Sequence, residues 1–210
     1  MRRTATTANA VLGLLALRPR WTTYEITRQM RRNMRFFWPR AESRIYAETK
    51  SLVAKGLARA DRELVGRRPR TIYSITPAGR SALRTWLATP PRATALECEP
   101  LLRVFLADYA TREQLQMALD QARDDADAIL SVGRVVGHEY LAGTAPFQDQ
   151  IHVRAFVFDF LSHHARMLRD WADRTELALD RWPAMAADAK IAAARRVIDD
   201  NLRDYPPPAE

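Results

Sequence analysis

The segment between Pro39 and Gly56 constrains the fold of this chain most strongly, because a proline and a glycine delimit one amphipathic helix that ends near Lys55. Proline is tolerated near a helix start, and glycine readily adopts the left-handed conformation that ends a helix. The two faces differ: the apolar stripe consists of Ala41, Ile45, Thr49, Leu52 and Val53, and the opposite face of Ser43, Arg44, Ala47, Lys50 and Ser51. Such a helix can rest on a domain and present cations to a DNA major groove, so we interpret it as a recognition helix.

Two helices are predicted before it. Residues 8–17 are apolar on nearly all sides, which indicates a buried helix closed by Pro19. Thr22 to Glu25 has the spacing of a capping box, in which a hydroxyl and a carboxylate three residues later each bind a backbone N–H group. The second helix should therefore start near Thr23. Its apolar stripe is Thr23, Ile26, Met30 and Met34, and its other positions include Arg28, Arg31, Arg32 and Arg35.

A β-hairpin and a fourth helix are predicted after Gly56. Residues 57–62 and 70–75 are rich in residues that favour strands, and Gly66 and Pro69 between them are turn residues. Thr76 and Pro77 then form an N-cap with proline at the first helical position, and Pro90-Pro91 ends that helix. Three helices, a hairpin and a fourth helix predict a winged helix-turn-helix. The basic hairpin tip is expected to reach a phosphate backbone or a minor groove through Arg67, Arg68 and Arg70.

The positive charge is concentrated in the N-terminal half. Residues 1–92 contain 20 Lys+Arg and 5 Asp+Glu, a net charge of +15, whereas residues 93–210 carry −7, which together give the total of +8. Concentrated positive charge is typical of a domain whose partner carries phosphates, because cations that meet phosphates release counterions. The alternative is a generically basic protein with an arginine-rich surface.

The C-terminal half is predicted to be helical. A short helix over residues 100–109 is followed by a capping box at Thr111–Gln114, which opens a long helix. A break at Gly143 to Pro146 precedes a second long helix, so the two should form an antiparallel pair with apolar surface still to cover. Dimerisation would cover that surface, unless the helices pack only against each other. A further helix is predicted over residues 184–203.

The predicted fold class is therefore mainly α, with a winged helix-turn-helix domain followed by an all-helical dimerisation domain. The expected boundaries are a DNA-binding domain at 1–90, a linker at 91–99, a dimerisation domain at 100–203 and a disordered tail at 204–210.

Catalytic and metal-binding functions find little support in the sequence. The single cysteine, Cys98, fits a reducing cytoplasm, and no run of about 18 apolar residues exists to span a membrane. His163 and His164 fall on different sides of a helix and should not bind one metal as a pair. Glycine-rich phosphate-binding loops and a nucleophile elbow are absent from the sequence. We expect a cytoplasmic protein that is not an enzyme, with no catalytic residues, no metal and no cofactor.

The sequence resembles a known family over roughly residues 10–87. The segments YEITRQMRRN, FFWPRAESRIYAETKSLVAKGL and GRRPRTIYSITPAGRSALRTWL are similar to the N-terminal domain of PadR-type transcriptional regulators. The continuation EPLLRVFLADYATREQLQMAL resembles the start of the helical C-terminal domain in longer members, including the virulence-activator type. The resemblance does not extend beyond about Trp182.

The resemblance implies a homodimeric DNA-binding regulator, most often a repressor, that is released by a small molecule or another signal. Two copies related by a two-fold axis can bind an inverted-repeat DNA operator. It implies DNA contacts by Tyr24 and Tyr46, by Ser43, Arg44 and Lys50 on the recognition helix, and by Arg67, Arg68 and Arg70 in the wing. Instead of contacting DNA, Tyr46 could belong to the hydrophobic core. Arg44 and Lys50 could likewise be ordinary solvent-exposed residues with no DNA contact. A competing function is a winged-helix adaptor that binds proteins without sequence-specific DNA binding.

A small aromatic or hydrophobic effector is a further expected partner. Four aromatic residues could line an apolar chamber between the domains or across a dimer, although core packing is their usual role: Trp86, Phe105, Phe160 and Trp171.

Overall fold

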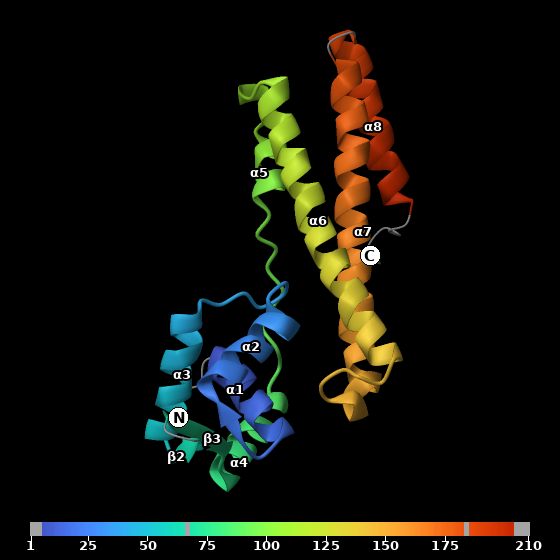
Figure 1. Cartoon of the computed structure of the whole chain (residues 1–210). Helices are drawn as coiled ribbons and strands as arrows, with labels where there is room; N and C mark the ends of the chain where they lie inside the picture. The colour runs from blue at the N-terminus through green and yellow to red at the C-terminus, as the bar shows by residue number, and fades with distance from the viewer. Residues whose placement is uncertain (1–5, 66–67, 183–184, 204–210) are drawn as a thin grey trace. The chain divides into compact units, whose positions relative to one another are not determined.

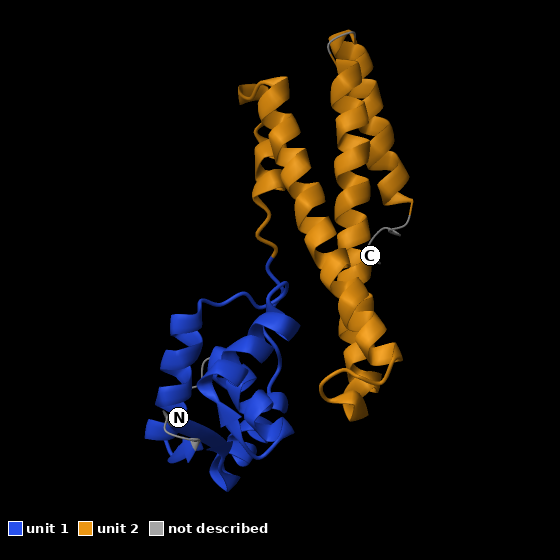
Figure 2. Cartoon of the chain, viewed as in Figure 1, with its two compact units in different colours: residues 1–95 blue, residues 96–210 orange. Residues whose placement is uncertain are grey.

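The structure is a computed structural model that describes residues 6–65, 68–182 and 185–203. The chain divides into two compact units, Met1–Ala95 and Leu96–Glu210, which Figure 2 shows in different colours. The division falls inside the segment 91–99 that the sequence predicts as a linker. The predicted tail at 204–210 lies outside the described residues.

The first unit is a winged helix-turn-helix, as the sequence predicts. Its elements in chain order are α1 (Thr6–Leu17), β1 (Trp21–Thr22), α2 (Thr23–Met34), α3 (Glu42–Ala54), β2 (Ala58–Val65), β3 (Arg68–Ile75) and α4 (Pro77–Leu87) (Figure 1). The centre of the unit is α1, which contacts α2, α3, α4 and β3. Its buried apolar residues include Val11, Leu12, Leu14 and Leu15, so the prediction of a buried first helix is confirmed.

The predicted capping box begins α2. The backbone N–H of Thr22 donates to Oε2 of Glu25 over 2.8 Å, and the backbone N–H of Glu25 donates to Oγ1 of Thr22 over 3.2 Å. Ile26 and Met30 are buried as predicted, while Thr23 and Met34 are half-buried and Gln29 is buried with the stripe.

The antiparallel sheet has the strand order β1-β3-β2 and contains one strand that the sequence analysis missed. Trp21 of β1 pairs with Tyr73 of β3, and both side chains are buried. Both hairpin strands are longer than predicted, so the assignment of Pro69 as a turn residue was wrong: Pro69 lies in β3 opposite Leu64. A proline is tolerated there because β1 pairs with Ile72 and Tyr73, and within the described residues no strand pairs with Pro69 on that side of β3.

The second unit is helical. Its elements are α5 (Glu99–Phe105), the 3₁₀ turn η1 (Ala107–Tyr109), α6 (Arg112–Leu141), the 3₁₀ turn η2 (Gln148–Gln150), α7 (Ile151–Arg181) and α8 (Ala187–Leu202). The predicted antiparallel pair is confirmed, since α6 and α7 lie side by side over much of their length (Figure 1). Their core includes Leu119, Ala122 and Ala172, and alanine side chains allow the helix backbones to approach closely.

Three boundaries in this unit refine the prediction. The helix expected over residues 100–109 is interrupted, because α5 ends at Phe105 before η1 begins. The break between the long helices is confirmed, with Gly143 at a φ of 72° and Phe147 at 60°. The last helix begins at Ala187 rather than at residue 184. None of the helices in the described ranges is both long and apolar enough to cross a bilayer.

Candidate nucleic-acid interface

Helix α3 is fixed to the first unit by one face. Ile45, Thr49 and Leu52 are buried, and Oγ1 of Thr49 donates to the backbone oxygen of Ile45 over 2.9 Å, which satisfies the buried hydroxyl. The predicted stripe was wrong at Ala41, which is exposed as the N-cap, while Val53 is half-buried. The helix ends as predicted, because Gly56 has a φ of 69°.

The start of α3 differs from the expectation that Pro39 lies close to it. The helix begins at Glu42 with Ala41 as its N-cap, and a turn follows the end of α2. The backbone N–H of Trp38 donates to the backbone oxygen of Met34 over 2.7 Å, and its indole Nε1 donates to Oγ1 of Thr7 over 3.3 Å. This anchor joins the turn between the two helices to α1.

The exposed face of α3 carries most of the residues predicted for DNA binding. Ser43, Arg44 and Lys50 are exposed. Tyr46 is 42% exposed rather than a core residue, and the ammonium of Lys50 lies 4.4 Å from the centre of its ring. Ser51, by contrast, is half-buried. The ion–ring contact restrains Lys50 on the helix surface by a cation–π attraction.

Tyr24 is the aromatic residue that was predicted for DNA binding on α2. Its side chain is 70% exposed, and the guanidinium carbon of Arg28 lies 5.5 Å from the centre of its ring. Each tyrosine ring therefore contacts a cationic side chain, and each tyrosine is also exposed to solvent.

Of the three hairpin arginines predicted to contact DNA, the structure describes the side chain of one. Arg70 is exposed in β3, opposite Glu63 of β2. Arg68 pairs through its backbone with Val65, and its side chain lies outside the described part. Arg67 lies outside the described residues altogether.

Glu48 is a residue of this helix that the sequence analysis missed. It is 8% exposed, and its Oε1 lies 2.7 Å from Nη2 of Arg44 one helical turn earlier. The available signal was the spacing of four residues between a cation and an anion on a predicted helix. It places a carboxylate next to a guanidinium predicted to face DNA.

The acidic residues of the basic half are all neutralised. Each of the five carboxylates in residues 1–92 forms an ion pair with an arginine: Glu25 with Arg18, Glu42 with Arg31, Glu48 with Arg44, Asp61 with Arg59, and Glu63 with Arg20. The Glu48 side chain, with 10% of its surface exposed, is the most buried of the five carboxylates. The excess positive charge of the unit therefore resides on its other lysines and arginines, where it attracts a polyanion.

The four aromatic residues predicted for an effector lie in different environments. Trp86 belongs to the first unit and is half-buried on α4, and the other three belong to the second unit. Phe105 is exposed, Phe160 is exposed and stacks on His164 with 6.4 Å between ring centres, and Trp171 packs against the core of α6 and α7. Surface hollows on α6 and α7 in the described part of the chain are lined by other residues, among them Arg112 and Asp180 in one and Leu130 and Phe158 in another.

No arrangement of three or more His, Cys, Asp or Glu side chains suited to a metal ion occurs in residues 6–65, 68–182 and 185–203.

Comparison with known proteins agrees with the resemblance seen in the sequence. Residues 11–85 match the model of the transcriptional regulator PadR-like family. That family consists of regulators rather than enzymes. No protein of curated function matches the sequence significantly.

Solved structures of PadR-like regulators share the fold. Bacillus subtilis PadR in complex with operator DNA is 20% identical with a TM-score of 0.70, covering 83% of this chain and 99% of that one. The same protein in complex with p-coumaric acid is 21% identical with a TM-score of 0.62, covering 82% and 97%. The Vibrio cholerae virulence activator AphA is 20% identical with a TM-score of 0.63, covering 84% and 99%. The virulence-activator type named from the sequence is thus among the structural neighbours.

Proposed function

Because residues 11–85 form a PadR-like regulator domain, we propose that this protein is a transcriptional regulator that binds a specific DNA sequence as a homodimer. One observation carries the proposal: the part of the chain that matches the regulator family lies in the half with a net charge of +15, whereas residues 93–210 carry a net charge of −7. A neighbour of the same fold, Bacillus subtilis PadR, is known in complex with operator DNA.

The proposed DNA surface consists of the exposed face of α3, Tyr24 and the hairpin. Ser43 is small and exposed, which permits close approach of the helix to a groove, while Arg44 and Lys50 provide cations. Tyr24 and Tyr46 are exposed, and each lies beside a cation, Arg28 and Lys50 respectively. Arg67, Arg68 and Arg70 are proposed to meet the phosphate backbone from the wing.

The test is binding of the full-length protein to the DNA upstream of its own gene, titrated against salt and repeated with excess unrelated DNA. We expect binding that resists the competitor, with one dimer per site. Binding that unrelated DNA abolishes would instead favour the protein-interaction adaptor, because general electrostatic attraction has no sequence preference.

The wing makes a separate contribution that the same assay measures. Replacing Arg67 and Arg68 by Ala should weaken binding to all DNA sequences and reduce the salt dependence, because fewer counterions are released. Loss of sequence preference with unchanged salt dependence would show that the wing reads bases instead.

Homodimerisation is proposed from the apolar surface of α7. An apolar stripe at helical spacing lies along this helix and is exposed in the single chain: Val153, Phe156, Val157, Phe160 and Met167. A second copy would remove this stripe from water and would bring two recognition helices to an inverted repeat with half-sites about one helical turn apart. Equilibrium sedimentation gives the oligomeric state.

Repression and its release by a small hydrophobic effector complete the proposal. A complex of Bacillus subtilis PadR with p-coumaric acid shows that a protein of this fold binds a small aromatic acid. The candidate residues in this chain are Trp86, Phe105, Phe160 and Trp171. A panel of small aromatic compounds should contain one that weakens operator binding, and equal DNA affinity with every compound would contradict this part of the proposal.

A further inference from the structure

The ion pair of Arg44 and Glu48 combines the most buried carboxylate among the ion pairs described in the first unit with an exposed arginine. Glu48 lies at the edge of the α3 face that packs on the domain and is 8% exposed, whereas 58% of the Arg44 side-chain surface is exposed. A largely buried carboxylate thus lies against a guanidinium that is mostly exposed to solvent.

Helix stability does not explain this arrangement. A cation and an anion four residues apart stabilise a helix best when the anion comes first in the sequence, and here the cation comes first. Burying a carboxylate also costs free energy that an exposed pair avoids. The pair of Arg31 and Glu42, which also involves α3, is exposed on both sides.

Attraction to DNA does not explain Glu48 either. A negative charge on the helix that faces a polyanion opposes binding by simple Coulomb repulsion. What Glu48 does supply is orientation. A guanidinium is a planar fork of five donors, and a carboxylate 2.7 Å from Nη2 attracts that end of the fork and so biases the direction in which the other donors point.

We infer that Glu48 is a positioning residue, which holds the guanidinium of Arg44 in the one orientation that a matched DNA site requires. The inference rests on the proposed DNA-binding function and adds a determinant of sequence preference to it. A side chain that is already ordered loses less conformational freedom on binding, and its benefit is largest where the geometry of the contact is defined. The selected site therefore gains more from Glu48 than unrelated DNA does.

The experiment compares two duplexes of equal length: one selected from a random library by the wild-type protein, and one unrelated. Full-length variants are titrated against both by fluorescence anisotropy at several salt concentrations. Glu48→Gln should weaken binding to the selected duplex about tenfold, the range of one well-formed base contact, and should change binding to the unrelated duplex little. The double variant Arg44→Ala with Glu48→Gln should bind no more weakly than Arg44→Ala, because nothing remains to be positioned.

A matched control separates positioning from charge. Glu42→Gln removes the same charge from the same helix, but from an exposed pair, and should not reduce the preference for the selected duplex. Tighter binding of Glu48→Gln to both duplexes, an equal loss on both, or an equal loss of preference in Glu42→Gln would each overturn the inference.

A second variant avoids any effect on folding. Arg44 is exposed, so Arg44→Lys leaves the packing of α3 intact and keeps the charge, yet removes the planar fork. It should lose the preference for the selected duplex with an unchanged salt slope, and retained preference would contradict the inference. If the wild-type protein selects no sequence at all, the proposed function itself fails; if it does and Glu48→Gln behaves like it, only the inference fails.

Discussion

Glu25 in the first turn of α2 binds Thr22 and Arg18, which precede the helix. Protonation of its carboxylate should therefore change the free energy of unfolding. The carboxylate accepts from Thr22 through one oxygen and lies 2.7 Å from Nη2 of Arg18 through the other. Burial alone would raise the pKa of Glu25, but the hydrogen bonds from Thr22 and the charge of Arg18 outweigh it, and the pKa lies below the ordinary value of 4.5.

The first prediction follows from that direction. Glu25→Ala should lower the free energy of unfolding by about 1 kcal/mol at neutral pH, the usual contribution of a helix cap. A carboxyl with a lowered pKa in the folded state stabilises the protein above its unfolded pKa and loses this effect as the pH falls through the folded value. The difference between wild type and variant should thus shrink below pH 4.5 in thermal melts.

The matched control is Glu25→Gln, which keeps an oxygen for the backbone N–H of Thr22 and loses only the charge. It should be less destabilised than Glu25→Ala at neutral pH. A difference between wild type and Glu25→Ala that stays constant down to about pH 3 would contradict the assignment.

Two glycines in the first unit should respond in opposite ways to the same substitution. A Cβ at Gly79 would lie 2.0 Å from the backbone oxygen of Leu57 and 2.9 Å from Cγ1 of Ile75, so Gly79→Ala must separate α4 from the start of the hairpin. We expect a loss of about 2–3 kcal/mol. Gly13 lies inside α1 with no atom within 4 Å of the added Cβ, and Gly13→Ala should stabilise by about 0.5–1 kcal/mol. Urea unfolding measures both, and a loss in both would show that the space around Gly13 is occupied.

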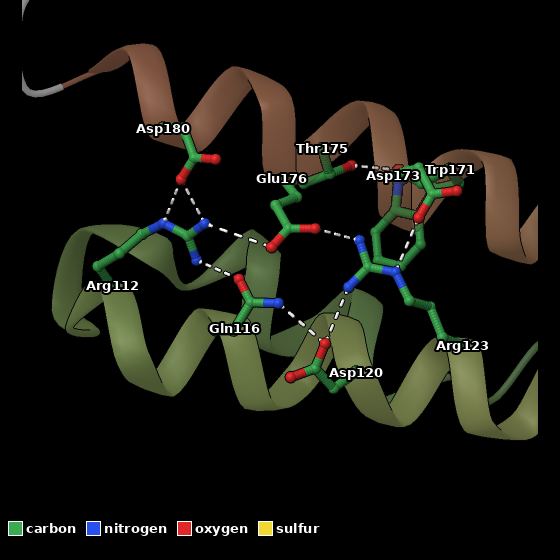
Figure 3. A network of polar contacts seen from close by, with 9 residues as sticks. All are labelled: Arg112, Gln116, Asp120, Arg123, Trp171, Asp173, Thr175, Glu176 and Asp180. Carbon is green, nitrogen blue, oxygen red and sulfur yellow. Dashed lines mark hydrogen bonds and ion pairs between the residues drawn. The ribbon is translucent and has the colours of Figure 1, made fainter.

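At the scale of elements, a chain of polar contacts fixes how α6 and α7 lie against each other (Figure 3). Nε of Arg112 donates to Oδ1 of Asp180 over 3.0 Å, and Nε of Arg123 donates to Oδ1 of Asp173 over 2.7 Å. Glu176 lies between the two arginines and contacts both. Burial alone would lower the pKa of Arg123, but the bonds to the acids raise it, so the guanidinium stays charged.

Removing Arg123 should therefore destabilise the second unit more than removing a solvent-exposed arginine. Arg123 is 21% exposed and pairs with Asp120, Asp173 and Glu176, so Arg123→Ala leaves several carboxylates close together without a cation. We expect a loss of about 1–2 kcal/mol in urea unfolding. The control is Arg169→Ala, whose single pair with Asp127 is exposed on both sides and should cost under about 1 kcal/mol. Equal losses would mean that the network adds nothing beyond its separate pairs.

The elements that the sequence predicted correctly are those with local signals. The caps at Thr22, Thr76 and Thr111 mark helix starts through contacts within four residues, and Gly56 marks a helix end. The strand β1 was missed because its two residues are defined by pairing with β3, some 50 residues later. The strand position of Pro69 likewise depends on how far β1 extends along β3.

In the candidate site, too, the features that follow from local sequence pattern were predictable, and those that depend on tertiary packing were not. The exposure of Arg44 and Lys50 follows from helical periodicity, which a sequence contains. The burial of Glu48 does not, because it depends on which neighbouring helices lie over the edge of α3. The aromatic residues expected at an effector site also depend on tertiary packing, and Trp171 lies against the core of its own unit.

At the scale of the whole molecule, DNA affinity and oligomeric state should be coupled. A single winged helix contacts one half-site, whereas two linked copies bind an inverted repeat with the second contact made effectively intramolecular. Phe156 and Phe160 lie one turn apart on α7, are 78% and 65% exposed, and belong to the stripe that we propose a second copy covers. Replacing both by serine should shift the protein towards monomers in sedimentation experiments.

The same double variant, Phe156→Ser with Phe160→Ser, should lose at least about a hundredfold in affinity for an inverted repeat, while its affinity for a single half-site stays unchanged. Its thermal stability should change little at concentrations where both proteins are monomeric, because both rings already face solvent in the single chain. Met117→Ser is a suitable control, since Met117 is exposed on α6 among polar neighbours and outside the stripe. A variant that remains dimeric, or a control that dissociates equally, would place the interface elsewhere, and unchanged affinity in a monomeric variant would show that each copy binds DNA independently.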